Sequence, residues 1–304
     1  MKRFVRSALS ELSYRTIRFT NSELEGIRIL TYHRVNDWYP DDVLSVRIAR
    51  FRGHMEYLAA NNWRVIPLAE AVEQLSQING VTSGPSTTLG AGKLQVTSDS
   101  VLAPRPLPLA PEKAVVLTFD DGYADNYWHA HSILRTHNYP ATLFVASGLM
   151  DRHAPMPRYA KGVVRRDRGL SWNEIRDMQA GGIEIGAHSV THAVLTRLSL
   201  EAARREIVES KQRIKQELGR PATAFAYPRG RFSAHVIRLV REAGFTSACS
   251  ERIGANRPGE DLFRLRRTEI SAFDTLDDFE KKLFGAFDWL HVAAQTMESV
   301  GVRG

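Results

Sequence analysis

The chain is short of cysteine: Cys249 is the only one among 304 residues. A single cysteine excludes an internal disulfide framework and a zinc site built on thiolates. The residues before it, Phe-Thr-Ser-Ala at 245–248, favour a small buried residue over a nucleophile.

The chain also lacks a long apolar run and a secretory signal. No stretch has the apolar length that spans a membrane, and no continuous apolar core follows Met1-Lys2-Arg3. Residues 1–26 instead mix apolar and basic residues near helical spacing. They predict a basic amphipathic segment that lies on an anionic membrane surface or packs on the body of the protein. The missing signal favours the cytoplasmic side or the periphery of the inner membrane, and an extracytoplasmic location is the alternative.

A nucleic-acid motif is missing as well. The net charge is +7 and the isoelectric point is about 9.6, which permits contact with an anionic surface. The basic residues are scattered, however, and no nucleic-acid-binding pattern accompanies them. We therefore expect no nucleic-acid partner.

Strand-like and helix-like segments alternate along the chain. Apolar, β-branched stretches predict strands over 27–32, 64–68, 114–119, 141–146, 182–187, 222–227, 245–249 and 266–270. Amphipathic stretches between them predict helices over 48–61, 127–137, 172–180, 200–218 and 234–243. About seven or eight strands interleaved with helices predict an α/β fold, most simply a closed or partly closed (β/α) barrel with a parallel sheet.

The barrel is expected to span residues 27–272. The basic segment 1–26 precedes it, and a helical segment at 273–304 follows it. Residues 79–112 carry several glycines and a proline-rich end with few charges. This composition predicts a flexible insertion within one connection of the barrel rather than a linker between domains.

The most informative motif is Asp120-Asp121, which follows the apolar run 114–119 and precedes Gly122. Side chains alternate in direction along a strand, so two neighbouring carboxylates point the same way only if the chain turns there. Gly122 permits such a turn. A solvated Asp-Asp-Gly turn is the simpler interpretation of these three residues alone.

A second motif, His-Ser-Val-Thr-His at 188–192, reverses that preference. We expect the two histidines, four residues apart, to share one side of a helical turn that the serine and threonine cap or orient. Two imidazoles and one carboxylate, with positions left for water, are typical of a catalytic divalent-metal site. Asp121, His188 and His192 provide that set and leave Asp120 as a base. Two surface histidines at a helix start are the alternative.

The candidate residues are expected to meet at one edge of the barrel. His33 follows the first predicted strand, Asp120-Asp121 the third, His188 the fifth, and a Pro-Arg pair at 228–229 the sixth. The C-terminal ends of parallel strands form one rim, where barrels of this kind carry their active sites. The sequence therefore predicts a single site on that rim.

Together the two motifs resemble those of the polysaccharide deacetylase family, carbohydrate esterase family 4, over residues 27–270. The resemblance implies a deformed (β/α) barrel that removes acetyl groups from N-acetylated amino sugars of a polysaccharide or glycoconjugate. By position it implies Asp121, His188 and His192 as ligands of one divalent ion and Asp120 as the base. Zinc (Zn2+) is the default ion, while cobalt, nickel or iron (Co2+, Ni2+, Fe2+) fit the same ligands. The implied partner is an N-acetylated glycan.

The sequence departs from the family pattern at two places. The family's Arg-x-x-Pro-Tyr is replaced by Phe-Ala-Tyr-Pro-Arg at 225–229, so the arginine that orients the base is missing and Arg229 stands at the tyrosine's place. The family's late Leu-x-His, which gives the general acid, is replaced by Leu-Arg-Arg at 265–267. Arg229, Arg34 and Arg267 are the candidates to orient Asp120.

His33 is the candidate for the missing acid. Residues 30–35, Leu-Thr-Tyr-His-Arg-Val, resemble the opening strand of circularly permuted poly-N-acetylglucosamine deacetylases, whose acid histidine comes from the first strand. The first and last strands of a closed barrel are neighbours, so His33 can stand where the late histidine is lost. A core histidine hydrogen-bonded near Tyr32 is the alternative.

Two further expectations concern the substrate. A backbone N–H near Tyr227, in the turn with Pro228 and Arg229, is expected to hold the oxyanion together with the ion. Trp172 is expected either to stack on the sugar or to lie in the core.

Two other functions remain open. An O-acetyl esterase on the same scaffold would tolerate loss of the general acid, because an alkoxide leaves more easily than an amine. A non-catalytic glycan-binding protein would keep the ion for structure, but a structural ion does not need Asp120.

Overall fold

The computed structural model describes residue 14 and residues 26–77 and 113–288. The predicted insertion 79–112 lies outside the described residues, as do nearly all of the predicted segment 1–26 and the last part of 273–304. No helix in the described ranges has the length and hydropathy to cross a membrane.

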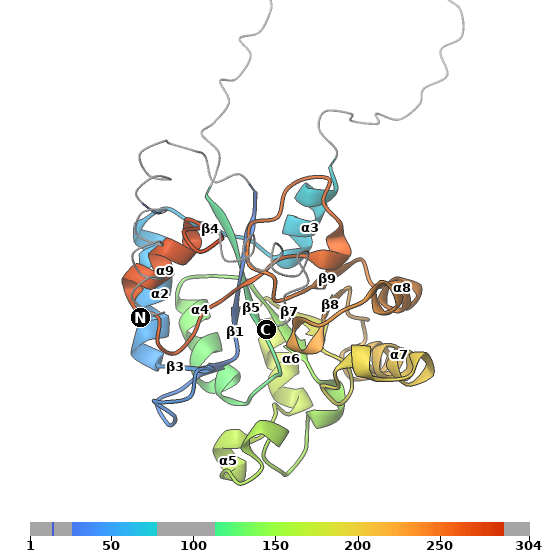
Figure 1. The fold of residues 1–304 in the computed structure, drawn as a ribbon. Coiled ribbons are helices and arrows are strands. Elements are labelled where there is room, and N and C mark those ends of the chain that lie inside the picture. Colours follow the sequence, from blue (N-terminus) through green and yellow to red (C-terminus); the bar gives the residue numbers. More distant parts are fainter. Residues whose placement is uncertain (1–13, 15–25, 78–112, 289–304) are drawn as a thin grey trace, which may run out of the picture.

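The core of the fold is an eight-stranded parallel sheet that curls into a deformed (β/α) barrel, as the sequence predicts (Figure 1). Hydrogen bonds join the strands in the order β10-β1-β5-β6-β7-β8-β9, with β4 beside β5. A parallel bridge between Cys249 and Leu265, which precedes β10, brings the two ends of the sheet together. The strands are β1 (Arg28–Tyr32), β4 (Arg64–Val65), β5 (Ala114–Phe119), β6 (Ala141–Val145), β7 (Ile183–Ala187), β8 (Ala224–Ala226), β9 (Ser247–Cys249) and β10 (Thr268–Glu269).

Helices lie between the strands, and several of them cover the outside of the sheet (Figure 1). The α-helices are α2 (Ile48–Ala60), α3 (Leu68–Ser76), α4 (Ser132–Thr136), α5 (Val164–Asp167), α6 (Trp172–Ala180), α7 (Leu200–Leu218), α8 (Ala234–Glu242) and α9 (Leu276–Leu283). A π-helical segment, η1 (Asn126–His131), precedes α4. The predicted helix 127–137 is therefore π-helical in its first half and α-helical in its second. The 3-10 turns are η2 (Ser147–Leu149), η3 (Pro157–Tyr159), η4 (Leu195–Arg197), η5 (Pro228–Gly230) and η6 (Leu262–Arg264). A separate parallel pair, β2 (Arg34–Val35) and β3 (Ser45–Val46), follows β1.

Alternation along the strands divides the buried side chains into two layers. In β5, Val115, Leu117 and Phe119 belong to the larger core, which includes residues of the surrounding helices, whereas Val116 belongs to the smaller one. The smaller core also contains Ile29, Phe144 and Cys249 from other strands and three residues of α3. Because β5 is buried on both faces, its sequence is a nearly continuous apolar run, which explains why its bounds were predicted to the residue.

Helix α7 matches its predicted bounds for local reasons. The Ser199 side chain accepts a hydrogen bond from the Ala202 N–H at the start, and Gly219 ends the helix at φ 75°. The predicted strand 64–68 is wrong at its end: β4 stops at Val65, and α3 begins at Leu68. Pro67 there takes an extended conformation that suits the residue before a helix.

Candidate metal centre and active site

The Asp120-Asp121 pair lies where β5 ends, and the chain turns there as the sequence predicts. The Asp120 N–H still donates to the Tyr32 carbonyl of β1 at 3.0 Å. Asp121 and Gly122 then adopt left-handed conformations, with φ 73° and φ 79°. Aspartate tolerates this conformation better than most residues, at a modest cost in backbone energy. The turn breaks the strand alternation, so both carboxylates are delivered to the C-terminal rim.

The loop after β7 does not form the predicted helical turn. Residues 188–192 are irregular, and both Ser189 and His192 have positive φ, at 63° and 61°. The left-handed residues return the chain on itself, so the two imidazoles approach through a loop rather than by helical spacing. Their ring centroids are 4.8 Å apart. The histidines thus meet as predicted, but by a different backbone path.

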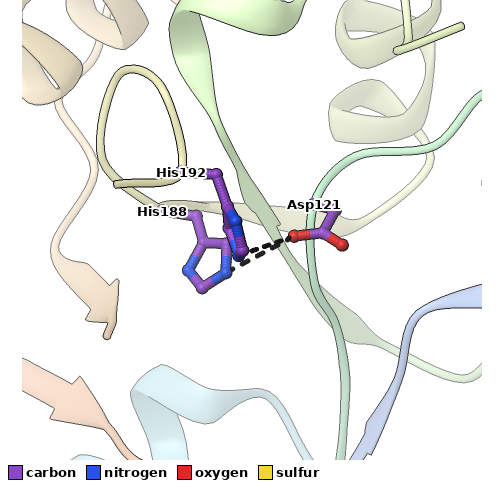
Figure 2. A group of neighbouring side chains, drawn as sticks. All are labelled: Asp121, His188 and His192. Carbon is purple, nitrogen blue, oxygen red and sulfur yellow. Dashed lines mark ion pairs between the residues drawn. The ribbon is translucent and has the colours of Figure 1, made fainter. Parts of the chain in front are cut away.

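Asp121, His188 and His192 converge on one point (Figure 2). Asp121 Oδ1 lies 3.5 Å from His188 Nε2 and 3.3 Å from His192 Nε2. Ligands about 2.0–2.1 Å from a tetrahedral ion are separated by about 3.3–3.4 Å, so these spacings fit one ion. Asp121 Oδ1 is also buried without a hydrogen-bond donor. A carboxylate oxygen buried in this way is satisfied by a cation, so the three residues fit a divalent ion.

His188 is held in the orientation that a ligand needs. Its Nδ1 lies 2.8 Å from the Ala226 carbonyl at the end of β8, which leaves Nε2 directed toward Asp121. Burial lowers the pKa of His188 to about 4, although the nearby charge of Asp120 raises it. The ring is therefore neutral at physiological pH and has a free lone pair for a metal.

Glu206 of α7 fixes the loop 188–192, the histidine loop, by hydrogen bonds. Its carboxylate accepts hydrogen bonds from the N–H groups of Val190 and Thr191, at 2.8 and 2.9 Å, and from the Thr191 hydroxyl at 2.8 Å. On the other side, the Gly148 N–H donates to the Val190 carbonyl at 2.8 Å. Thr191 therefore helps to orient the loop, as predicted, but it acts through Glu206, which no sequence motif singles out.

Arg267 is the arginine that orients Asp120. Its two terminal nitrogens each lie 2.7 Å from one oxygen of the Asp120 carboxylate, and its Nε donates to the Ser250 carbonyl at 3.0 Å. Both side chains are 1% exposed. Burial alone would raise the pKa of Asp120, but the charge and hydrogen bonds of Arg267, together with the nearby charge of His188, hold it well below its usual range. Asp120 is consequently ionised at every physiological pH.

The other two candidate arginines do not reach Asp120. Arg34 is fully buried in a separate network, where it donates to Asp125 at 2.6 Å and Asp167 at 3.0 Å. Three tyrosine rings also surround the Arg34 guanidinium at 4.4 to 5.3 Å. Arg229 is exposed in the turn η5. The sequence alone does not decide among the three arginines, because only the closed barrel brings residues distant along the chain together.

His33 lies just beyond β1, the neighbour of β10, as the barrel topology requires. Its side chain is 13% exposed, and its Nδ1 lies 3.8 Å from a carboxylate oxygen of Glu269. Its nearby charge also contributes to the low pKa of Asp120. Tyr32 pairs with His54 instead, at 3.1 Å. His33 thus lies on the rim near the base rather than beside Tyr32, and its role as acid stays a prediction.

A turn follows Tyr227, as expected, but Tyr227 itself has no free donor, and the oxyanion role of this turn stays a prediction. Its N–H is bound to the Cys249 carbonyl at 3.0 Å, and its hydroxyl donates to the Phe263 carbonyl at 3.0 Å in the core. Pro228 has no N–H, and the Gly230 N–H donates back to Tyr227. In the described part of this turn, the Arg229 N–H is the one left without such a partner.

Trp172 is not a sugar platform. It is 1% exposed at the first position of α6, within the larger core, with the guanidinium of Arg213 5.9 Å from the ring centroid. The expectation of stacking is therefore corrected in favour of the core tryptophan. Its position after the N-cap Ser171 turns the ring inward, where a sugar cannot reach it.

Comparison with known proteins agrees with this geometry. The profile of the family described as polysaccharide deacetylase matches residues 109–248, a range that contains both motifs. Over that range the chain is similar to the polysaccharide deacetylase family. It is 24% identical over 244 residues to YxkH from Bacillus subtilis (strain 168), across 80% of this chain and 71% of that protein.

Two further similarities concern the sequence and the fold. The chain is 27% identical over 167 residues to the poly-beta-1,6-N-acetyl-D-glucosamine N-deacetylase of Escherichia coli (strain K12). This match covers 54% of this chain and 20% of that protein. The structure of the Streptococcus pyogenes deacetylase PplD in complex with acetate superposes with a TM-score of 0.65 at 20% identity. That match covers 85% of this chain and 98% of PplD, and it supports the fold.

Proposed function

We propose that this protein is a metal-dependent hydrolase that removes acetyl groups from N-acetylated amino sugars of a polysaccharide or glycoconjugate. The proposal rests on the observation that the two adjacent aspartates have different partners. Asp121 faces His188 and His192, whereas Asp120 faces Arg267. A purely structural ion would need the first arrangement but not the second.

A divalent ion held by Asp121, His188 and His192 would polarise the acetyl carbonyl and acidify a water molecule. Zinc is the ion we propose for this donor set, and cobalt, nickel and iron are the alternatives. Asp120 takes the proton of the attacking water as general base. Although Arg267 engages both of its oxygens, a carboxylate has about four acceptor positions, so further ones remain for that water.

The remaining groups act on the other atoms of the acetamide. The Arg229 N–H donates to the oxygen on which negative charge develops, in place of the Tyr227 N–H. His33 protonates the departing amine, a step that an amide needs more than an ester does. The matched Escherichia coli protein is named for poly-β-1,6-N-acetylglucosamine, so we propose an N-acetylglucosamine polymer as the first substrate to test.

The test is acetate release from N-acetylglucosamine oligomers by the metal-loaded protein and by two neighbouring variants. Asp120→Asn is expected to keep the metal and lose at least 100-fold in kcat, because general-base catalysis is worth about 10²–10⁴-fold. Asp121→Asn is expected to lose metal as well. No acetate release by the metal-loaded wild type from any acetylated sugar would refute the proposal.

The His33→Ala variant distinguishes the proposed N-deacetylase from the alternative, an O-acetyl esterase. If His33 is the acid of an amidase, the variant loses amide turnover by about 10²–10⁴-fold and retains most turnover of an O-acetylated sugar. Metal content, measured on the same sample, controls for damage to the site. Equal retention of both activities would remove His33 from the mechanism.

A further inference from the structure

The exposed large apolar side chains of the described residues are not scattered over the molecule. All of them lie in connections that leave the C-terminal ends of strands, on the rim that carries the metal centre. They are Val43 after β2, Val163 and Val164 after β6, Leu198 and Leu200 after β7, and Phe273 and Leu276 after β10. Val164, Leu200 and Leu276 are each the first residue of a helix.

Their exposure is substantial and is not explained by the fold. Val163 is 52% exposed, Leu200 52% and Phe273 50%. The connections at the opposite end of the barrel contain none of the exposed large apolar residues found in the described ranges. Soluble proteins carry isolated exposed apolar residues, but their confinement to one face indicates a surface that contacts an apolar partner.

Unpaired cations accompany the four of these residues that follow β6 and β7, whereas Val43, Phe273 and Leu276 adjoin Asp42, Asp274 and Asp277. The connections after β6, β7 and β8 expose six basic residues for which the described part of the chain offers no ion pair: Arg152, Lys161, Arg165, Arg197, Arg229 and Arg231. Up to the first residues of α6, α7 and α8, the same three connections expose one acidic residue, Asp151, and Glu201 then follows Leu200. Lys161 and Arg165 flank the two valines, and Arg197 precedes Leu198. Exposed apolar side chains among cations suit the headgroup region of an anionic bilayer.

The connection after β6 extends farthest from the body. Figure 1 shows α5 standing apart at the lower edge of the view, beyond the ends of the strands. The segment is nevertheless tied to the centre: the Leu170 N–H donates to the Gly122 carbonyl at 2.9 Å, and Arg34 joins Asp167 of α5 to Asp125. A surface that rests on α5 therefore keeps a fixed relation to the metal ligands.

We infer that the part of this rim formed by Val163, Val164, Leu198, Leu200 and the six cations named above is a docking surface for an anionic lipid bilayer. Docking there turns the metal centre toward the membrane. The surface is distinct from the predicted amphipathic segment 1–26. It is also independent of the deacetylase reaction, since binding to vesicles requires no hydrolysis.

The test is co-sedimentation of the full chain with vesicles of phosphatidylcholine alone or with 30% phosphatidylglycerol, in low and moderate salt. Wild type is expected to bind the anionic vesicles at least ten-fold more tightly than the neutral ones, and less tightly as salt rises. Val163→Ser with Val164→Ser removes apolar surface without changing charge and should weaken binding at least three-fold. Arg165→Glu should weaken it by at least as much.

Arg220→Glu is the matched control, because it makes the same charge change between α7 and β8, at the far end of the barrel. It should bind as wild type does. Equal effects of Arg165→Glu and Arg220→Glu would overturn the inference, because net charge alone would then govern binding. Loss of binding to soluble polygalacturonate, with vesicle binding unchanged in both rim variants, would overturn it in favour of an anionic polysaccharide partner.

Discussion

Removal of the arginine beside Asp120 is the perturbation with the clearest expected consequence. In Arg267→Gln the Asp120 carboxylate stays 1% exposed but loses the guanidinium that binds both of its oxygens at 2.7 Å. Breaking a buried ion pair from one side costs about 3–5 kcal/mol, because an uncompensated charge is left in the interior. We expect the melting temperature to fall by roughly 5–15 °C at pH 7.

The stability difference between the wild type and Arg267→Gln is expected to depend on pH. In the wild type the pKa of Asp120 is lowered, so its contribution to stability is present above its unfolded pKa of about 3.9 and is lost as the pH falls through the folded value. In Arg267→Gln, burial without the arginine raises that pKa, and the variant loses stability as the pH rises above about 4. The stability difference between the two proteins should therefore be smaller near pH 3 than near pH 7.

The assay is chemical denaturation of both proteins from pH 3 to pH 8, with Arg266→Gln as the control. Arg266 is the adjacent residue, but its partner Glu260 is about one-third exposed, and such pairs are worth about 0–1 kcal/mol. The acid limb of kcat/KM should also move to higher pH in Arg267→Gln alone. A stability loss that is the same at pH 3 and pH 7 would refute the electrostatic account of this pair.

Other predictions test the remaining contacts. Glu206→Ala removes the acceptor that fixes the histidine loop and should weaken metal affinity about 10–100-fold, measured by competition with a chromogenic chelator; Glu209→Ala on the same helix should not. Unchanged affinity in Glu206→Ala would show that the loop holds its shape alone. Trp172→Ala should cost about 3–5 kcal/mol in unfolding free energy while the folded fraction keeps its KM for glycan; a raised KM without loss of stability would restore Trp172 to the substrate site. Arg34→Met leaves Asp125 and Asp167 buried without their cation and should destabilise the protein by about 3–5 kcal/mol; a wild-type melting temperature would contradict that cost.

The sequence predicts most of the fold because the longer strands of the barrel are buried on both faces. Runs such as 114–119 and 182–187 are mainly apolar, with Glu184 the one charged residue, and turn residues bound them, so their positions are evident without tertiary information. The short strands are harder: β4, β8 and β10 have two or three residues each, and only their pairing defines them.

The candidate site divides in the same way. Asp121, His188 and His192 are predictable because each group follows a strand, and parallel strands end at one rim. The orienting arginine is not, because Arg267 and Asp120 are 147 residues apart in the chain and meet only when β1 pairs with both β10 and β5. Glu206 and the Arg34 network carry no local signature, since Glu206 binds backbone amides and Arg34 binds carboxylates 91 and 133 residues away.

The central claim is that one ion at Asp121, His188 and His192 and the adjacent base Asp120 together hydrolyse an N-acetylated sugar. The direct measurement is acetate release from N-acetylglucosamine oligomers as metal-stripped protein is titrated with zinc, with Asp120→Asn titrated in parallel. The account predicts wild-type activity that rises linearly to one ion per chain, and a variant that binds the same single ion without comparable turnover. Activity that is independent of added metal, or an Asp120→Asn variant as active as the wild type, would contradict it.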